Sequence, residues 1–155
     1  MFDGGIIVTR IYTLVNQKGG VGKTTTTINL GAYLAQLGLR VLVVDLDPQA
    51  NATSCLGVDK LSVQGGTYEA LLGDKKVASY VLLNERLNLS LLPSSPSLAG
   101  AEVELVDELA REFRLRKAIE PLVDRYDYIL IDCPPSLGLL TVNGLMAAVN
   151  GMIVP

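Results

Sequence analysis

The sequence contains no histidine and no tryptophan, and only two of its 155 residues are cysteine. Without an imidazole, neither a Ser-His-Asp nor a Cys-His nucleophile can be assembled. Cys55 and Cys133 are too few for a disulfide framework, and a zinc site built from His and Cys is excluded as well. Any chemistry in this chain must therefore depend on carboxylates, lysines, hydroxyls or a metal.

Charged residues and long apolar runs are also scarce. Charged residues make up 19% of the chain, and 13 basic against 16 acidic residues give a net charge of −3. The chain as a whole is therefore not a basic nucleic-acid-binding protein, although charge can still gather on one face. No apolar run approaches the roughly 18–20 residues of a membrane-spanning helix. The segment Met1–Arg10 contains Asp3 and does not resemble a secretory signal, so we expect a cytoplasmic protein.

The length and the apolar content fit one compact domain. A chain of 155 residues is long enough for a core covered on both sides and too short for two ordinary domains. Hydrophobic residues make up 49% of the chain, which argues against disorder and for several fully buried strands. We therefore expect a mostly parallel sheet with helices on both faces.

Short β-branched apolar runs alternate with helical patterns, which is the order of elements in an α/β fold. We expect helices at about Lys23–Leu37, closed by Gly38, at Tyr68–Leu72, through Leu98–Arg125 with a break near Glu112, and at Leu137–Val149. We expect strands at Ile11–Val15, Arg40–Asp45, Leu87–Leu92, Tyr128–Asp132 and Met152–Val154. The alternation of Leu87–Leu92 also suits a sheet edge.

A glycine-rich segment joins the first expected strand to the first expected helix, and it reads QKGGVGKTT over residues 17–25. Glycines let successive N–H groups point inward and the following helix adds its positive N-terminal end, so the segment predicts a phosphate-binding loop. Lys23 can reach the β- and γ-phosphates, and the Thr24 hydroxyl can bind Mg²⁺. The ordinary pattern has glycine where Gln17 stands, and this sequence offers a second lysine, Lys18.

Carboxylates stand at the ends of two expected strands. Asp45 ends the second strand, and Asp47 follows on the same face because side chains repeat every two residues. Asp132 ends the apolar strand Tyr128–Asp132. Ligands of open α/β sheets bind at this carboxyl edge. We therefore expect Asp132 near Mg²⁺, and one of Asp45 and Asp47 to orient a water while the other supports the metal or the loop.

Two remaining features are interpreted as structural. Cys133, next to Asp132, is expected to be a small buried residue rather than an iron–sulfur ligand. A basic cluster is expected to be a solvated helix face balanced by neighbouring glutamates, and its members are Arg111, Arg114, Arg116 and Lys117.

The motifs resemble those of the deviant Walker A ATPases, and within them the ParA/Soj family of chromosome and plasmid partition proteins. The similar segments are residues 18–25, DLDPQANAT at 45–53 and DCPPSLGLLTVN at 132–143. The resemblance runs from about Ile11 to Pro155 and corresponds to the N-terminal portion of a typical member. It implies a P-loop NTPase domain at 11–155 whose C-terminal part is missing, after an N-terminal extension at 1–10.

The resemblance also implies ATP and Mg²⁺ as cofactors and a homodimer that closes around ATP. Lys18 would then reach the partner's nucleotide, Lys23 would hold the phosphates of its own subunit, and Asp47 would position the hydrolytic water. The implied metal site consists of Thr24, Asp132 and Asp45. The implied nucleotide-binding residues are Lys18, Gly19, Gly20, Val21, Gly22, Lys23, Thr24 and Thr25.

The function implied by the resemblance is an ATP-dependent switch in DNA segregation, associated with the nucleoid and working with a ParB-like centromere-binding partner. Family members bind DNA without sequence preference through basic residues late in the chain, so DNA binding is not expected of the portion present here. Two alternatives stay open. One is a MinD-like ATPase at a membrane surface, which needs an amphipathic C-terminal helix, and the other is a nucleotide-binding fragment without turnover.

Overall fold

A six-stranded sheet forms the centre of the protein in a computed structural model that describes residues 8–155. Its strands lie in the order β3-β4-β2-β5-β1-β6, and every neighbouring pair is parallel except β3–β4. They are β1 (Arg10–Leu14), β2 (Val41–Asp45), β3 (Leu82–Asn84), β4 (Leu89–Leu92), β5 (Tyr128–Asp132) and β6 (Gly151–Ile153). The expected mostly parallel sheet is confirmed. Of the expected N-terminal extension, residues 1–7 lie outside the described residues, and Arg10 belongs to β1.

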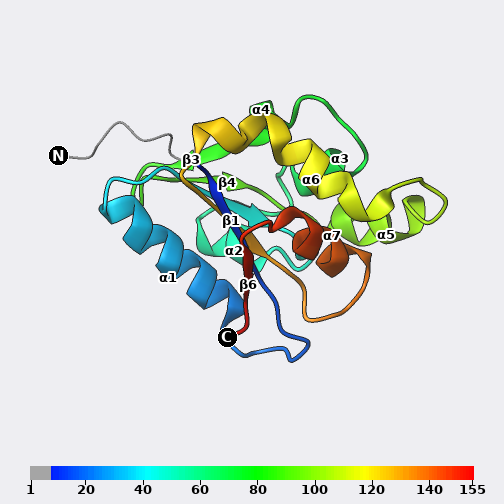
Figure 1. Cartoon of the computed structure of the whole chain (residues 1–155), viewed down its shortest axis with the longest axis horizontal. Coiled ribbons are helices and arrows are strands. Elements are labelled where there is room, and N and C mark those ends of the chain that lie inside the picture. The colour runs from blue at the N-terminus through cyan, green and yellow to red at the C-terminus, as the bar shows by residue number, and fades with distance from the viewer. Residues whose placement is uncertain (1–7) are drawn as a thin grey trace.

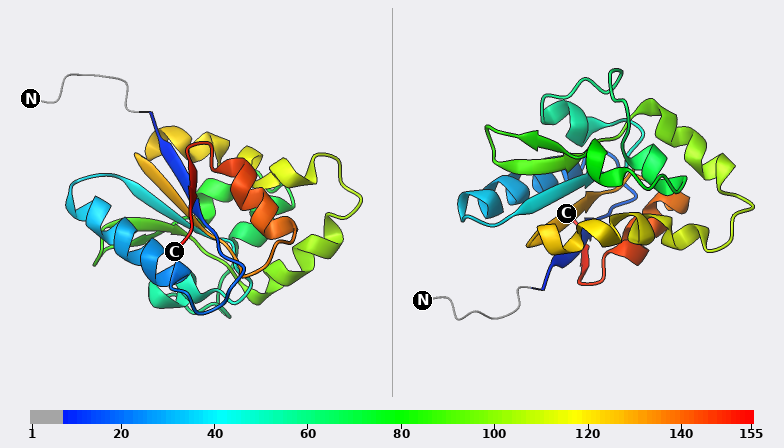
Figure 2. Two further views of the ribbon diagram at one scale, coloured as in Figure 1. Left: turned by 60° about the horizontal axis from the view of Figure 1, so that its bottom comes forward. Right: turned by 90° about the horizontal axis from the view of Figure 1, so that it is seen from above.

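Helices cover both faces of this sheet, as Figures 1 and 2 show. The α-helices are α1 (Lys23–Gln36), α2 (Asn51–Cys55), α3 (Thr67–Leu71), α4 (Val77–Tyr80), α5 (Ala101–Glu104), α6 (Arg114–Ile119) and α7 (Leu139–Ala147). Short 3₁₀ segments are η1 (Pro96–Gly100), η2 (Arg111–Phe113) and η3 (Glu120–Arg125). Within residues 8–155, no helix has the length and apolar character needed to cross a membrane.

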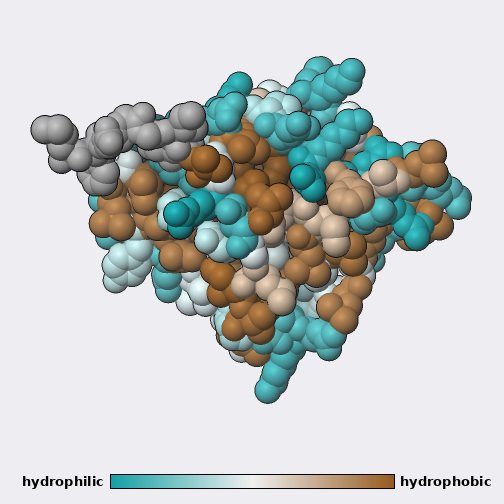
Figure 3. Space-filling model, viewed as in Figure 1, coloured by the Kyte–Doolittle hydropathy of each residue, from teal (hydrophilic) through white to brown (hydrophobic). Residues whose placement is uncertain are grey.

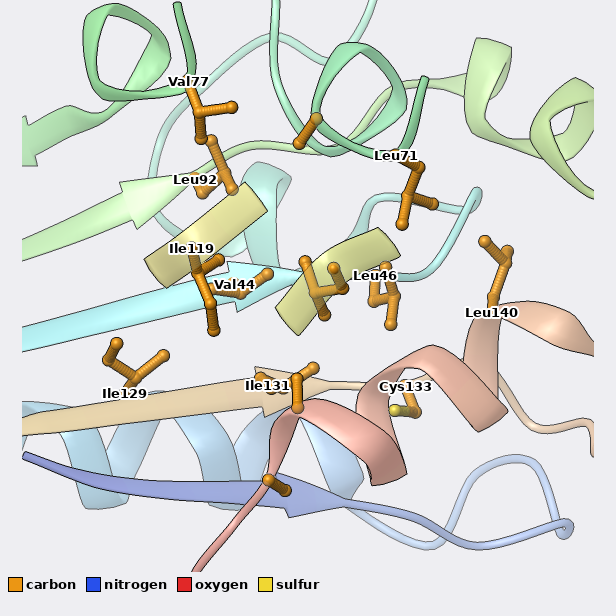
Figure 4. Packing of buried hydrophobic residues seen from close by; sticks show 14 of the residues in the cluster. Val44, Leu46, Leu71, Val77, Leu92, Ile119, Ile129, Ile131, Cys133 and Leu140 are labelled. Carbon is orange, nitrogen blue, oxygen red and sulfur yellow. The ribbon is translucent and has the colours of Figure 1, made fainter. Parts of the chain in front are cut away.

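The strands bury side chains on both faces, which explains their continuous apolar runs. Along β2, Leu42 and Val44 belong to the cluster that packs against α3 to α7, whereas Val41 and Val43 belong to the cluster under α1 and α2. Figure 4 shows the first cluster, in which Val44 lies near Ile119 of α6. Because successive side chains point to opposite faces, one short strand supplies both cores.

Strand β4 is not at the sheet edge. Residues 82–84, which were not expected to form a strand, pair with it antiparallel as β3, so that β4 lies between β3 and β2. The turn between β3 and β4 is held by Asn84, whose Oδ1 accepts a hydrogen bond of 2.9 Å from the Leu87 N–H. Three residues with this composition give too weak a local pattern to predict a strand.

The helix expected over Leu98–Arg125 is interrupted earlier than Glu112, because residues 105–110 are not helical. Ala110, at the end of the interruption, has a φ of 53°. The chain becomes helical again where Asn143 of α7 caps it. The Leu115 N–H donates to Asn143 Oδ1 at 3.0 Å, and Asn143 Nδ2 donates to the Arg111 carbonyl at 2.9 Å. This cap comes from another part of the chain, so the local sequence does not reveal it.

Helix α1 ends at Gln36 and is closed by Gly38, as expected. The Gly38 N–H donates to the Ala35 carbonyl at 3.0 Å, and the Leu39 N–H donates to the Leu34 carbonyl at 3.2 Å. This pair of bonds is a Schellman motif, which satisfies carbonyls left free at a helix end. The chain then turns directly into β2, whose carboxyl end carries part of the candidate site.

Candidate functional site

The glycine-rich loop lies between β1 and α1, as expected. Gly20 and Gly22 have φ values of 71° and 88°, which are left-handed conformations that side chains other than glycine rarely adopt. Gly22 is the N-cap of α1, and its carbonyl accepts the first helical hydrogen bond, from Thr26 N–H at 2.8 Å. The loop therefore ends where the free N–H groups and the positive end of the α1 dipole are available to an anion.

A cavity of about 340 Å³ opens at this loop. It is lined by residues 19–25 together with Asp47, Asn51 and Pro135. The structure thus brings together most of the expected nucleotide-binding residues and Asp47. Asn51, the first residue of α2, was not expected here. The available signal was its position inside the DLDPQANAT segment, between Asp47 and Thr53.

The two lysines of the loop occupy different surroundings. Lys23 is buried, and its Nζ donates to the Lys18 carbonyl at 3.4 Å. Lys18 is exposed and does not line the cavity, and its N–H donates to Asn16 Oδ1 at 3.0 Å. Lys23 therefore belongs to the cavity of its own chain, whereas the side chain of Lys18 is accessible from outside.

Thr24 and Asp132 are in direct contact. The Thr24 hydroxyl donates to Asp132 Oδ2 at 2.6 Å. Burial raises the pKa of Asp132 to about 6, and the bond from Thr24 opposes that shift. Among the described residues, Asp132 Oδ1 is buried and has no hydrogen-bond partner. A buried carboxylate oxygen without a donor is costly, which indicates that a cation or a bound water belongs beside it.

This pair fits a magnesium ion held jointly with phosphate groups. Within residues 8–155, no group of three or more carboxylate, thiol or imidazole side chains is arranged to hold a metal ion by itself. Mg²⁺ usually takes one or two protein oxygens and completes its octahedron with phosphates and waters. Thr24 and Asp132 supply oxygens of that kind next to the cavity.

Asp45 and Asp47 differ in what they face. Asp47 lines the cavity, and its Oδ1 accepts a bond of 2.9 Å from the Gln49 N–H. Asp45 is fully buried, its Oδ1 accepts a hydrogen bond from the Asp47 N–H, and its Oδ2 accepts from the N–H and the hydroxyl of Thr53. Burial raises the pKa of Asp45 to about 7, against the effect of the Thr53 bonds. A part for Asp45 in metal binding stays a prediction.

The two features interpreted as structural have the expected surroundings. Cys133 is 1% exposed, its Sγ lies 3.0 Å from Thr13 Oγ1, and burial raises the pKa of the thiol to about 12. In the basic cluster, Arg114 forms an ion pair of 2.7 Å with Glu108, while Arg116 is exposed. The expected burial of Cys133 is confirmed, and the structure contains one of the expected pairings between the basic cluster and a neighbouring glutamate.

Comparison with known proteins agrees with this geometry. A family model described as an AAA domain (AAA_31) matches residues 9–155. The sporulation initiation inhibitor protein Soj of Bacillus subtilis is 51% identical over 146 residues, which are 94% of this chain and 57% of that protein. The chromosome partitioning protein ParA of Myxococcus xanthus is 53% identical over 152 residues, covering 98% and 53%. The chain therefore spans a little over half the length of these relatives.

Solved structures are similar in fold as well as in sequence. Cobyrinic acid a,c-diamide synthase of Mycobacterium smegmatis, with bound ATP analog and magnesium, has a TM-score of 0.92 and 46% identity, covering 96% of this chain and 60% of that one. A plasmid partition protein of Borrelia burgdorferi has a TM-score of 0.83 and 31% identity, covering 96% and 65%. The chain thus belongs to the AAA domain family and, within it, to the ParA/Soj group.

Proposed function

We propose that this chain binds ATP with Mg²⁺ and hydrolyses it as the nucleotide-binding part of a partition ATPase. The observation that carries the proposal is the buried Asp132 Oδ1, which has no partner among the described residues and lies beside Thr24 at the phosphate loop. The similar structure from M. smegmatis is described with an ATP analog and magnesium, and curated relatives are named for chromosome partition.

The residues of the site have distinct parts in this proposal. Lys23, buried in the loop, holds the β- and γ-phosphates together with the N–H groups of residues 19–25. Thr24 and Asp132 would hold Mg²⁺, which when bound neutralises charge that develops on the phosphoryl oxygens. The carboxylate of Asp47, which reaches the cavity wall, orients the attacking water.

Lys18 is assigned a contact with a second copy of the chain. Its side chain is exposed and outside the cavity of its own subunit. A lysine brought across an ATP-closed homodimer would stabilise developing phosphoryl charge, as an arginine finger does. The proposal therefore includes dimer closure as the switch and a ParB-like partner that stimulates hydrolysis and release near the nucleoid.

The test compares Asp47→Ala and Lys18→Ala with the parent chain in the presence of Mg²⁺ and ATP. Asp47→Ala should bind ATP and dimerise normally but turn over roughly 100-fold more slowly, because the water loses its orienting base. Lys18→Ala should bind ATP but lose the ATP-dependent dimer and turnover. Lys75→Ala, which removes an exposed lysine from the turn between α3 and α4, is the matched control and should resemble the parent.

The outcomes separate the alternatives. If Asp47→Ala hydrolysed ATP at the parental rate, Asp47 would not be a catalytic residue. If Lys18→Ala formed an undiminished ATP-dependent dimer, Lys18 would not contact the second copy of the chain. Nucleotide binding without turnover by the parent would favour the fragment alternative. ATP-dependent sedimentation with anionic vesicles would favour a membrane-surface ATPase. Absence of Mg²⁺-dependent ATP binding by the parent would overturn the proposal as a whole.

A further inference from the structure

A buried polar network lies behind Asp47 and joins three segments of the chain. Asp45 ends β2, Thr53 lies in α2 and Ser94 follows β4, and all three residues are fully buried. The Thr53 hydroxyl donates to Asp45 Oδ2 at 2.7 Å and accepts from the Ser94 N–H at 2.9 Å. The Ser94 hydroxyl in turn donates to the Asp47 carbonyl at 2.7 Å.

The network fixes both backbone polar groups of Asp47. Its N–H donates to Asp45 Oδ1 at 3.1 Å, and its carbonyl accepts from the Ser94 hydroxyl and, at 2.8 Å, from the Ala50 N–H. Hydrogen bonds in a buried setting are electrostatically strong and hold their partners in one arrangement. Since both the N–H and the carbonyl of Asp47 are held by hydrogen bonds, its backbone is fixed in one position, and its side chain reaches the cavity from there.

The same network determines where α2 begins. Ala50, the N-cap of α2, has a φ of 55° and provides no side-chain cap. Asp45 Oδ2 caps the helix instead, because it accepts a hydrogen bond of 2.9 Å from the Thr53 N–H at the third position of the helix. A non-glycine residue in a left-handed conformation persists only when its surroundings hold it there. Asp45, Thr53 and Ser94 supply those surroundings for residues 47–50.

We infer that Thr53 and Ser94 are positioning residues that hold Asp47 in place for water activation. The inference rests on the proposed ATPase function, because it assigns Asp47 the part given to it there. Neither hydroxyl lines the cavity at the phosphate loop, so both would act through Asp47. Ser94 is anchored from a further side, since the carbonyl of the preceding Pro93 accepts a bond of 2.9 Å from the Thr67 N–H of α3.

The test uses variants that remove single hydroxyls. Thr53→Val keeps the shape of the side chain but leaves the Ser94 N–H without its acceptor, and Ser94→Ala removes the donor to the Asp47 carbonyl. Thr53→Ser keeps the hydroxyl and should restore parental behaviour. The matched control is Thr9→Val. Thr9 is also buried, but it lies at the amino end of β1, away from the phosphate loop, and its hydroxyl is hydrogen-bonded to the Val123 and Tyr126 carbonyls.

The first measurement is amide hydrogen exchange in residues 47–51, with Mg²⁺ and a non-hydrolysable ATP analogue and without them. In Thr53→Val and Ser94→Ala these amides should exchange about tenfold faster or more, because opening of the loop no longer breaks the full network. In Thr53→Ser and Thr9→Val they should stay within about twofold of the parent. If the amides of residues 47–51 exchanged at the parental rate in both Ser94→Ala and Thr53→Val, the inference would be overturned. If one of the two variants does not fold, the result from the other decides.

The second measurement separates positioning from a purely structural contribution. In Thr53→Val and Ser94→Ala, kcat should fall roughly 10- to 100-fold, while KM for ATP changes less than about threefold, because a misplaced catalytic group affects the chemical step. A loosened loop with parental kcat would overturn the positioning role. A parent chain without turnover would contradict the proposed function, and the exchange measurement would still decide whether the two hydroxyls hold Asp47.

Discussion

Asp127 joins the beginning of β2 to the beginning of β5, at the end of the sheet away from the phosphate loop. Its Oδ2 accepts from the Arg40 N–H at 2.7 Å, and its Oδ1 accepts from Arg40 Nη2 at 3.0 Å. The hydrogen bond from the Arg40 side chain, followed by the bond from its N–H, holds the pKa of Asp127 below its usual range. The carboxyl group of Asp127 is therefore favoured in its ionised form in the folded protein, and it links the starts of two neighbouring central strands.

Replacing Asp127 by Asn should give a pH-dependent loss of stability. A lowered folded-state pKa contributes stability above the unfolded-state pKa, near 4, and that contribution is lost as the pH falls through the folded-state value. Asp127→Asn should therefore lower the free energy of unfolding by about 1–2 kcal/mol at neutral pH and by progressively less below about pH 4. Urea titrations at several pH values measure this. Asp124→Asn, at an exposed position, is the control, and a loss independent of pH would contradict the argument.

The candidate site could be predicted from the sequence only in part. The loop glycines, Lys23 and Thr24 lie in one short segment, so their spacing was sufficient to group them. Asp132 was placed near them because it ends an expected strand at the carboxyl edge of the sheet. The residues that hold Asp47 were not predictable in this way. Ser94 is 47 positions from Asp47 and has no motif of its own, and its contact depends on β4 lying beside β2.

Helix α7 approaches the sheet closely at one glycine. A Cβ on Gly144 would lie 2.5 Å from Cys133 Sγ and 3.1 Å from Thr13 Oγ1. Both of these atoms belong to buried residues at the carboxyl ends of β1 and β5. The packing of α7 against this part of the sheet therefore depends on the missing side chain, although glycine is a poor helix former.

Gly144→Ala should destabilise the protein despite the better helix propensity of alanine. The added methyl group overlaps Cys133 Sγ, and overpacking of this kind costs about 1–3 kcal/mol of unfolding free energy. Removing the sulfur should restore part of the loss, so Cys133→Ala combined with Gly144→Ala should be more stable than the sum of the single changes predicts. Chemical denaturation of the four proteins measures this coupling. Simple additivity would show that the contact with Cys133 is not the cause.

Among the helices and strands, those with long apolar patterns could be predicted from the sequence, whereas those with short patterns could not. Strands β1, β2 and β5 and helix α1 were predicted within one or two residues, because continuous burial and the Gly38 cap leave local traces. Strand β3 exists only because β4 offers it an edge. The restart of the helix at α6 depends on Asn143, 28 residues away from Leu115. Contacts of this kind are properties of the assembled fold.

Considered as a whole, the described part of the molecule presents apolar side chains around one edge of the sheet. Strand β6 has β1 as its neighbour on one side, and within residues 8–155 no strand pairs with its other side. Figure 3 shows hydrophobic side chains across the middle of the face on which β6 lies in Figure 1. Exposed apolar residues in β6 and in the segments directly flanking it are Val149, Met152 and Val154, and α7 before it exposes Met146. An open edge with such side chains favours pairing with another chain.

Met152→Lys should therefore reduce self-association of this chain. Met152 lies in β6 and is 61% exposed. A lysine on an edge strand opposes edge-to-edge pairing, because its charge would have to be desolvated or brought near the same lysine of the second chain. Sedimentation velocity over a range of concentrations without nucleotide measures the effect apart from any ATP-dependent dimer. The control is Leu61→Lys, which adds the same charge at an 80% exposed position outside the strands. If both substitutions reduced association equally, net charge rather than the edge of β6 would be responsible.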